Sequence, residues 1–177
     1  AKNLQHKFLN SFSFFFYMRL FVSIDLSDDV LDYVHSLQQG IDTSYGILRK
    51  ARSFHLTLEF VGEKDKKQCS YIQEQLRSIN FSEFELSTEE LGVFTPKQVR
   101  VVWLGLQRQE QLYLLQEQVH NIFGGKNKFN PHITLFRVVS LEDRLGFLDS
   151  LSRIETKPIS FTVDSFVLYE SVPGSDG

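Results

Sequence analysis

The chain has 177 residues, of which 42% are hydrophobic and 23% are charged, and its formal net charge is −3. This composition is typical of a globular protein with a buried core, and the small negative charge excludes a protein that coats nucleic acid through bulk positive charge. The single cysteine, Cys69, excludes an internal disulfide and a cysteine-based zinc site, and it fits a reducing compartment such as the cytoplasm.

The residues before Met18 differ in composition from the rest of the chain. Two lysines precede a phenylalanine-rich run that polar residues interrupt, and Met18 is the only methionine. The run is too short to span a bilayer, and no small-residue cleavage site follows it. We therefore predict that residues 1–17 are an extension outside the fold, that residues 18–177 form one domain, and that the protein does not associate with membranes.

Strand and helix patterns alternate along the remainder of the chain. In chain order they predict a strand at Arg19–Ile24, a helix from the N-cap Ser27 to Gly40, a strand at Phe54–Val61, a helix at Lys66–Ile79, strands at Phe84–Leu91 and Val99–Leu106, a helix at Glu110–Phe123, a strand at His132–Val139, a helix at Leu141–Leu151, and one long or two short strands within Ile159–Tyr169. The sequence contains no glycine-rich phosphate loop. This order predicts an α+β fold with helices packed outside antiparallel sheets.

Two of the predicted strands begin with the same four-residue pattern. The segments are His55–Leu58 (HLTL) and His132–Leu135 (HITL). Side chains two residues apart in a strand share a face, so each motif presents an imidazole and a hydroxyl on one face and apolar side chains on the other. If the two strands face each other, the four polar groups converge on one cleft.

This set of groups is suited to opening a cyclic phosphodiester. Two imidazoles with ordinary pKa values near ~6.5 can serve as acid and base together near neutral pH. Two hydroxyls can donate hydrogen bonds to phosphate oxygens. One histidine would take a proton from water and the other would give one to the departing ribose oxygen, and the residues alone leave open which histidine does which.

The motifs and their neighbours resemble the two-histidine (2H) phosphoesterase superfamily. Within it, the closest similarity is to the RNA 2′,3′-cyclic phosphodiesterases, also called the 2′-5′ RNA ligase family. The similarity extends over roughly residues 18–172 and is carried by Met18–Asp25 (MRLFVSID), Phe54–Glu63 (FHLTLEFVGE), Val101–Gly105 (VVWLG), Asn130–Arg137 (NPHITLFR) and Phe161–Glu170.

The resemblance implies a bilobal α+β fold, with two antiparallel sheets and outer helices related by a pseudo-two-fold axis and an active cleft between the lobes. It implies hydrolysis of the 2′,3′-cyclic phosphate at an RNA end to a 2′-phosphate, without metal or cofactor, with His55 as general acid and His132 as general base. It also implies that Thr57, Thr134 and Arg137 bind the phosphate. The expected partners are RNA 3′ ends or nucleotides with a cyclic phosphate, and the protein is expected to be a cytoplasmic monomer.

The sequence also predicts the positions of several residues near the motifs. Strict strand alternation puts Arg137 on the face opposite His132, so a strand end or a bulge is needed to bring it round. Glu59 is expected on the face of the first motif's polar residues as a solvated carboxylate. Phe60 and Phe136 are assigned to the core, although either could stack on a base.

Other titratable residues are given less specific roles. His35 and His120 are interpreted as structural residues on helices. Arg49, Lys50 and Arg52 precede the first motif and form either a solvated loop or a contact surface for RNA.

Two other functions stay open. One is a different 2H reaction, such as 2′-5′ RNA ligation or hydrolysis of a small cyclic nucleotide. The other is a non-catalytic module that binds an AMP-like nucleotide. Replacement of either motif histidine by asparagine would leave ligand affinity largely intact in a binding module but would slow an enzyme by roughly 10²-fold or more.

Overall fold

The computed structural model describes residues 4–7, 17–124 and 128–171. In chain order its elements are β1 (Leu4–Lys7), β2 (Tyr17–Asp25), α1 (Asp28–Gly40), β3 (Gly46–Lys50), β4 (His55–Asp65), α2 (Lys66–Arg77), β5 (Phe84–Val93), β6 (Val101–Leu106), α3 (Glu110–Phe123), β7 (His132–Leu141), α4 (Arg144–Ser152), β8 (Ser160–Val163) and β9 (Phe166–Ser171). The α+β class and the antiparallel pairing of most strands are confirmed.

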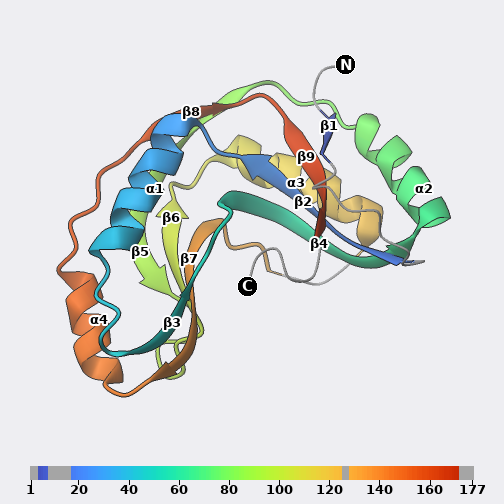
Figure 1. The fold of residues 1–177 in the computed structure, drawn as a ribbon. Coiled ribbons are helices and arrows are strands. Elements are labelled where there is room, and N and C mark those ends of the chain that lie inside the picture. The colour runs from blue at the N-terminus through green and yellow to red at the C-terminus, as the bar shows by residue number, and fades with distance from the viewer. Residues whose placement is uncertain (1–3, 8–16, 125–127, 172–177) are drawn as a thin grey trace.

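One curled sheet runs through the described part of the chain (Figure 1), in the order β1-β9-β2-β4-β7-β6-β5-β8, with β3 alongside β7. The prediction of two separate sheets in two lobes is wrong. The strands that carry the two motifs, β4 and β7, pair directly with each other at Leu56 and Ile133. This pairing joins the two halves of the chain into one sheet.

The helices form where capping residues and apolar spacing predict them. The hydroxyl of Ser27 accepts a hydrogen bond from the Val30 amide at 3.4 Å at the start of α1. Asp65 and Gln68 form a reciprocal capping box at the start of α2. α4 begins later than predicted, because β7 continues to Leu141 and the Asp143 carboxylate caps the helix that follows.

Part of the expected N-terminal extension takes part in strand pairing. Leu4–Lys7 form β1, which pairs in parallel with β9, and Tyr17 begins β2. Residues 8–16 of the expected extension lie outside the described residues, and the domain boundary before Met18 stays a prediction. Among the described residues, none of the helices has the length and apolar character needed to cross a membrane.

Candidate active site

The two HxTL motifs meet at the centre of the sheet. Leu56 of β4 stands opposite Ile133 of β7 in an antiparallel pair, and both side chains are fully buried against the helices. Because side chains alternate along a strand, the residues on either side of this pair project from the other face. We call that face of β4, β7 and the neighbouring strands the histidine face.

The register brings the polar groups of both motifs together on the histidine face. Continued by one residue in each direction, the antiparallel register of Leu56 with Ile133 sets His55 against Thr134 and Thr57 against His132. All four are half-buried. In a regular antiparallel ladder, diagonal residues of this kind lie about 7–8 Å apart, so this register places the two histidines as near neighbours on one face.

Each motif strand has a β-bulge directly after its threonine. In the pairing of β4 with β2, Thr57 is opposite Ser23 and Glu59 is opposite Val22, so Leu58 has no partner. In the pairing of β7 with β6, Leu135 is skipped in the same way. The duplicated motif therefore includes a duplicated irregularity in the backbone, and each bulge shifts the following side chains to the opposite face.

A glutamine from a helix supports each bulge. Gln38 of α1 donates through Nε2 to the carbonyl of Leu135 at 2.8 Å and to that of Ala51 at 3.0 Å. Gln116 of α3 donates to the carbonyl of Leu58 at 3.5 Å. The carbonyls of both bulged residues thus bond to side chains from the helix layer, and the Leu135 carbonyl also accepts a hydrogen bond from the Ala51 amide at 2.9 Å.

The bulge in β7 brings Arg137 to the histidine face. Phe136 is fully buried, as predicted, and Arg137 is exposed, opposite Val101 of β6. The bulge that Arg137 was expected to need is therefore present in β7, and Arg137 lies on the same face as His132 and Thr134.

The bulge in β4 reverses two predictions. Glu59 is 8% exposed, and its carboxylate accepts a hydrogen bond from Nδ1 of His120 at 2.6 Å, so it is not a solvated carboxylate on the histidine face. Phe60 is not a core residue: it is 70% exposed and stands opposite Phe21 on the histidine face. Phe60 thus occupies the place in the first motif that Arg137 occupies in the second.

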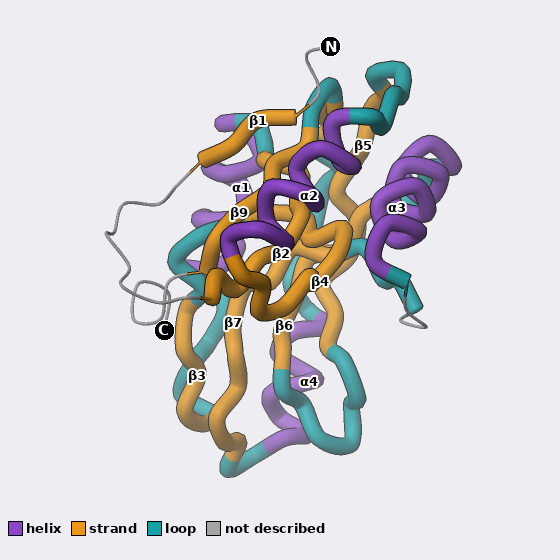
Figure 2. The backbone as a smooth tube through the Cα atoms, turned by 90° about the vertical axis from the view of Figure 1, so that its right-hand side faces the viewer, coloured by secondary structure: helices purple, strands orange, loops and turns teal. Residues whose placement is uncertain are grey.

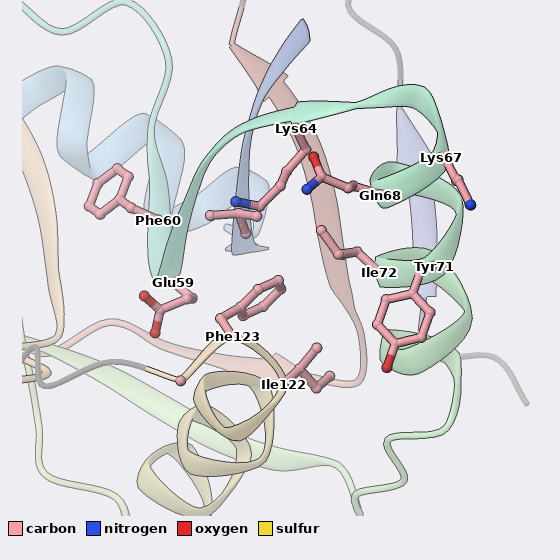
Figure 3. Close-up of a pocket in the computed structure, with 11 residues that line it drawn as sticks. Glu59, Phe60, Lys64, Lys67, Gln68, Tyr71, Ile72, Ile122 and Phe123 are labelled. Carbon is pink, nitrogen blue, oxygen red and sulfur yellow. The ribbon is translucent and has the colours of Figure 1, made fainter.

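A hollow of about 640 Å³ lies between β4, α2 and α3 (Figure 3). Ile72 of α2 faces Ile122 and Phe123 of α3 across it, and Glu59 and Phe60 lie at its edge. None of the motif histidines or threonines lines it. The four motif side chains therefore lie outside the hollow, and Phe60 lies both at its edge and on the histidine face.

The surroundings of His132 favour its neutral form. Its Nδ1 lies 2.8 Å from the carbonyl oxygen of Asn130, and because a carbonyl only accepts, Nδ1 carries the proton and Nε2 keeps its lone pair. The ring of Phe94 meets the imidazole edge-on at 4.7 Å, with Trp103 at 6.5 Å. Burial lowers the pKa of His132, and the hydrogen bond to Asn130 opposes this in part.

The surroundings of His55 are different. Phe21 lies 4.9 Å from its ring and stacks on Tyr169 at 5.3 Å. Asp25 stands opposite His55 in β2 and accepts a 2.6 Å hydrogen bond from the Tyr169 hydroxyl. Burial, followed by Asp25, raises the pKa of Tyr169, which therefore stays protonated through the neutral range.

The sequence did not identify Phe21, Asp25, Phe94 and Tyr169 as neighbours of the motif histidines. The available signal was the alternation within RLFVSID, which puts Phe21, Ser23 and Asp25 on one face of β2. Phe94 and Tyr169 had no comparable signal, because their places depend on strand pairing. No set of three or more His, Cys, Asp or Glu side chains within the described ranges is arranged to hold a metal ion.

Comparisons with known proteins agree with this geometry. A family model described as the 2′-5′ RNA ligase superfamily matches residues 26–174. The RNA 2′,3′-cyclic phosphodiesterase of Thermotoga maritima is 32% identical over 164 residues, which cover 87% of each chain. That of Archaeoglobus fulgidus is 30% identical over 128 residues, or 68% of this chain and 73% of the relative. The crystal structure of E. coli LigT complexed with 3′-AMP has a TM-score of 0.68 at 26% identity and covers 90% of this chain and 92% of its own.

Proposed function

The chain belongs to the 2′-5′ RNA ligase superfamily, and we propose that it hydrolyses the 2′,3′-cyclic phosphate at an RNA end to a 2′-phosphate. The observation that carries the proposal is the antiparallel register of the two motifs around Leu56 and Ile133. It gathers two imidazoles and two hydroxyls on one face of the sheet. Relatives over most of the chain are RNA 2′,3′-cyclic phosphodiesterases.

In the proposed reaction, His132 is the general base and His55 the general acid. With Nδ1 bonded to the Asn130 carbonyl, Nε2 of His132 takes a proton from water as the water oxygen attacks phosphorus. The bond from phosphorus to the 3′ oxygen of the ribose breaks, and protonated His55 gives its proton to that oxygen. A lowered pKa supports the base role of His132, because an imidazole must be neutral to accept a proton.

Three further side chains are proposed to stabilise the charge on the phosphate. The hydroxyls of Thr57 and Thr134 donate hydrogen bonds to its non-bridging oxygens. Arg137, on the same face beyond Thr134, supplies a permanent positive charge. All three residues lie on strands of the sheet, and groups held on a rigid scaffold need little reorganisation as charge develops in the transition state.

The expected substrates are RNA 3′ ends and nucleotides with a cyclic phosphate. Phe60 and Phe21 give the histidine face an aromatic surface beside His55 on which a base can stack. The relative LigT was crystallised with 3′-AMP, which supports recognition of a nucleotide. We assign the activity to the cytoplasm because the only cysteine, Cys69, is buried and unpaired.

The test is hydrolysis of a short RNA that ends in a 2′,3′-cyclic phosphate, in the presence of EDTA. We expect a product with a 2′-phosphate, and we expect His55→Ala and His132→Ala each to lower the rate by roughly 10²-fold or more. His35→Ala is the matched control, since His35 is an exposed residue of α1. Absence of turnover by the unmodified protein, with AMP still bound, would refute the proposal in favour of a binding module.

A further inference from the structure

Two exposed arginines stand side by side on the histidine face, beyond the threonine of the second motif. β3 lies beside β7 (Figure 2) and runs antiparallel to it, and the register pairs Arg49 directly with Arg137. The adjacent pair is Leu48 with Val138, and Val138 is buried. Because side chains alternate along each strand, both arginines project from the face that carries His132.

The arginine pair is unfavourable without an anion. Like charges directly opposite each other destabilise an antiparallel pair of strands. The ion pairs among the described residues, Glu59–His120 and Asp149–Arg153, do not involve either arginine. The chain nevertheless has a net charge of −3, so this concentration of positive charge is local. An anion between the two guanidinium groups removes the repulsion, and the planar fork of arginine binds phosphate through paired hydrogen bonds.

The distance from the motif residues indicates which anion fits. Along β7, Arg137 is the next residue after Thr134 to project from this face, about 7 Å away, with the bulged Leu135 and the buried Phe136 between them. Arg137 is therefore next to the proposed cyclic phosphate, whereas Arg49, on the neighbouring strand, lies outside the four motif groups. An RNA chain carries a second phosphate one nucleotide before its end, and a mononucleotide does not.

We propose that Arg49, beside Arg137, binds the phosphodiester one nucleotide before the reacting end, and that this makes RNA oligonucleotides better substrates than mononucleotides. This inference rests on the proposed function and deepens it, since it specifies the substrate class. Arg49 is in this view a specificity residue, because it contacts a part of the substrate that does not react.

The test compares a dinucleotide and a mononucleotide that both end in a 2′,3′-cyclic phosphate. We expect the unmodified protein to prefer the dinucleotide in kcat/KM by about tenfold or more, which corresponds to one hydrogen-bonded ion contact. Arg49→Ala should lose most of this preference. Arg77→Ala, an exposed arginine at the end of α2, removes the same charge and should keep it.

Salt dependence gives an independent readout of the phosphate contact. Loss of one contact to a single strand should make the plot of log(kcat/KM) against log[salt] shallower by about 0.7 for the dinucleotide. Equal kcat/KM values for the two substrates in the unmodified protein overturn the inference and leave the proposed function intact. So does a proportional loss on both substrates in Arg49→Ala.

A binding measurement separates failure of the inference from failure of the proposed function. If no cyclic phosphate is opened, the proposed function fails, and the arginine site is then judged by calorimetry with a dinucleotide and a mononucleotide that end in a 2′-phosphate. The inference requires Arg49→Ala to weaken binding of the dinucleotide more than that of the mononucleotide. An equal effect on the two ligands refutes it.

Discussion

The support of the bulge in β7 by Gln38 can be tested through stability. Gln38 is 6% exposed, and its amide makes two hydrogen bonds, to the carbonyls of Leu135 and Ala51. The variant Gln38→Met keeps the length and the helix propensity of the side chain but removes both bonds. At about 0.5–1.5 kcal/mol for each bond, the free energy of unfolding should fall by about 1–3 kcal/mol.

The equivalent residue on the other helix supplies a matched comparison. Gln116 makes one bond to its bulge, and at 3.5 Å that bond is at the limit of hydrogen-bond length. We therefore expect Gln116→Met to cost under about 1 kcal/mol.

Urea unfolding at equilibrium would measure both variants against the unmodified protein. A fall of 1 kcal/mol corresponds to about 2–4 °C in Tm for a chain of this size, so a thermal scan provides a second estimate. Equal losses in the two variants, or an unchanged midpoint for Gln38→Met, would refute the role given to Gln38.

Three further outcomes follow from the site. Burial lowers the pKa of His132, and a general base must be deprotonated to act, so kcat/KM should fall with decreasing pH only below the ordinary histidine pKa of about 6.5. A pH–rate profile whose acidic limb lies above that value contradicts the base role. Gly92→Ala places a Cβ in a clash with the indole of Trp103 and should disturb His132 and lower kcat/KM, whereas Gly40→Ala, with no neighbour within 4 Å, should not. Phe60→Ala should weaken nucleotide binding by about 1–3 kcal/mol in a calorimetric titration with an unchanged unfolding midpoint, since the ring is 70% exposed; unchanged affinity excludes stacking on this ring.

Features set by neighbours in sequence were predictable, and features set by pairing between distant strands were not. The helix starts at Ser27 and Lys66 were predictable because the capping residues lie within a few positions of the helix they stabilise. β3 was missed, since five residues with two cations carry little strand signal. The single sheet depends on the contact between Leu56 and Ile133, which no local pattern reports.

The bulges explain why the side-chain directions predicted from strand alternation were wrong after the threonine of each motif. Alternation after Thr57 assigns Glu59 to the histidine face and Phe60 to the core, and the register shift against β2 exchanges them. The shift depends on which residues of β2 pair with β4 and on the amide of Gln116 beneath. Neither can be read from the motif itself.

The neighbours of the two histidines, and not the duplicated bulges, provide the asymmetry on which a directional reaction depends. The paired motifs give the two histidines nearly equivalent backbone positions, so the acid and base roles must come from their neighbours. His132 has a carbonyl that fixes its proton on Nδ1 and so leaves Nε2 as an acceptor, and the ring of Phe94 packs edge-on against its imidazole. His55 stands opposite Asp25 of β2 and lies against the ring of Phe21, which stacks on Tyr169. In the proposed mechanism, a symmetric scaffold thus supports an acid on one strand and a base on the other because the residues around each imidazole differ.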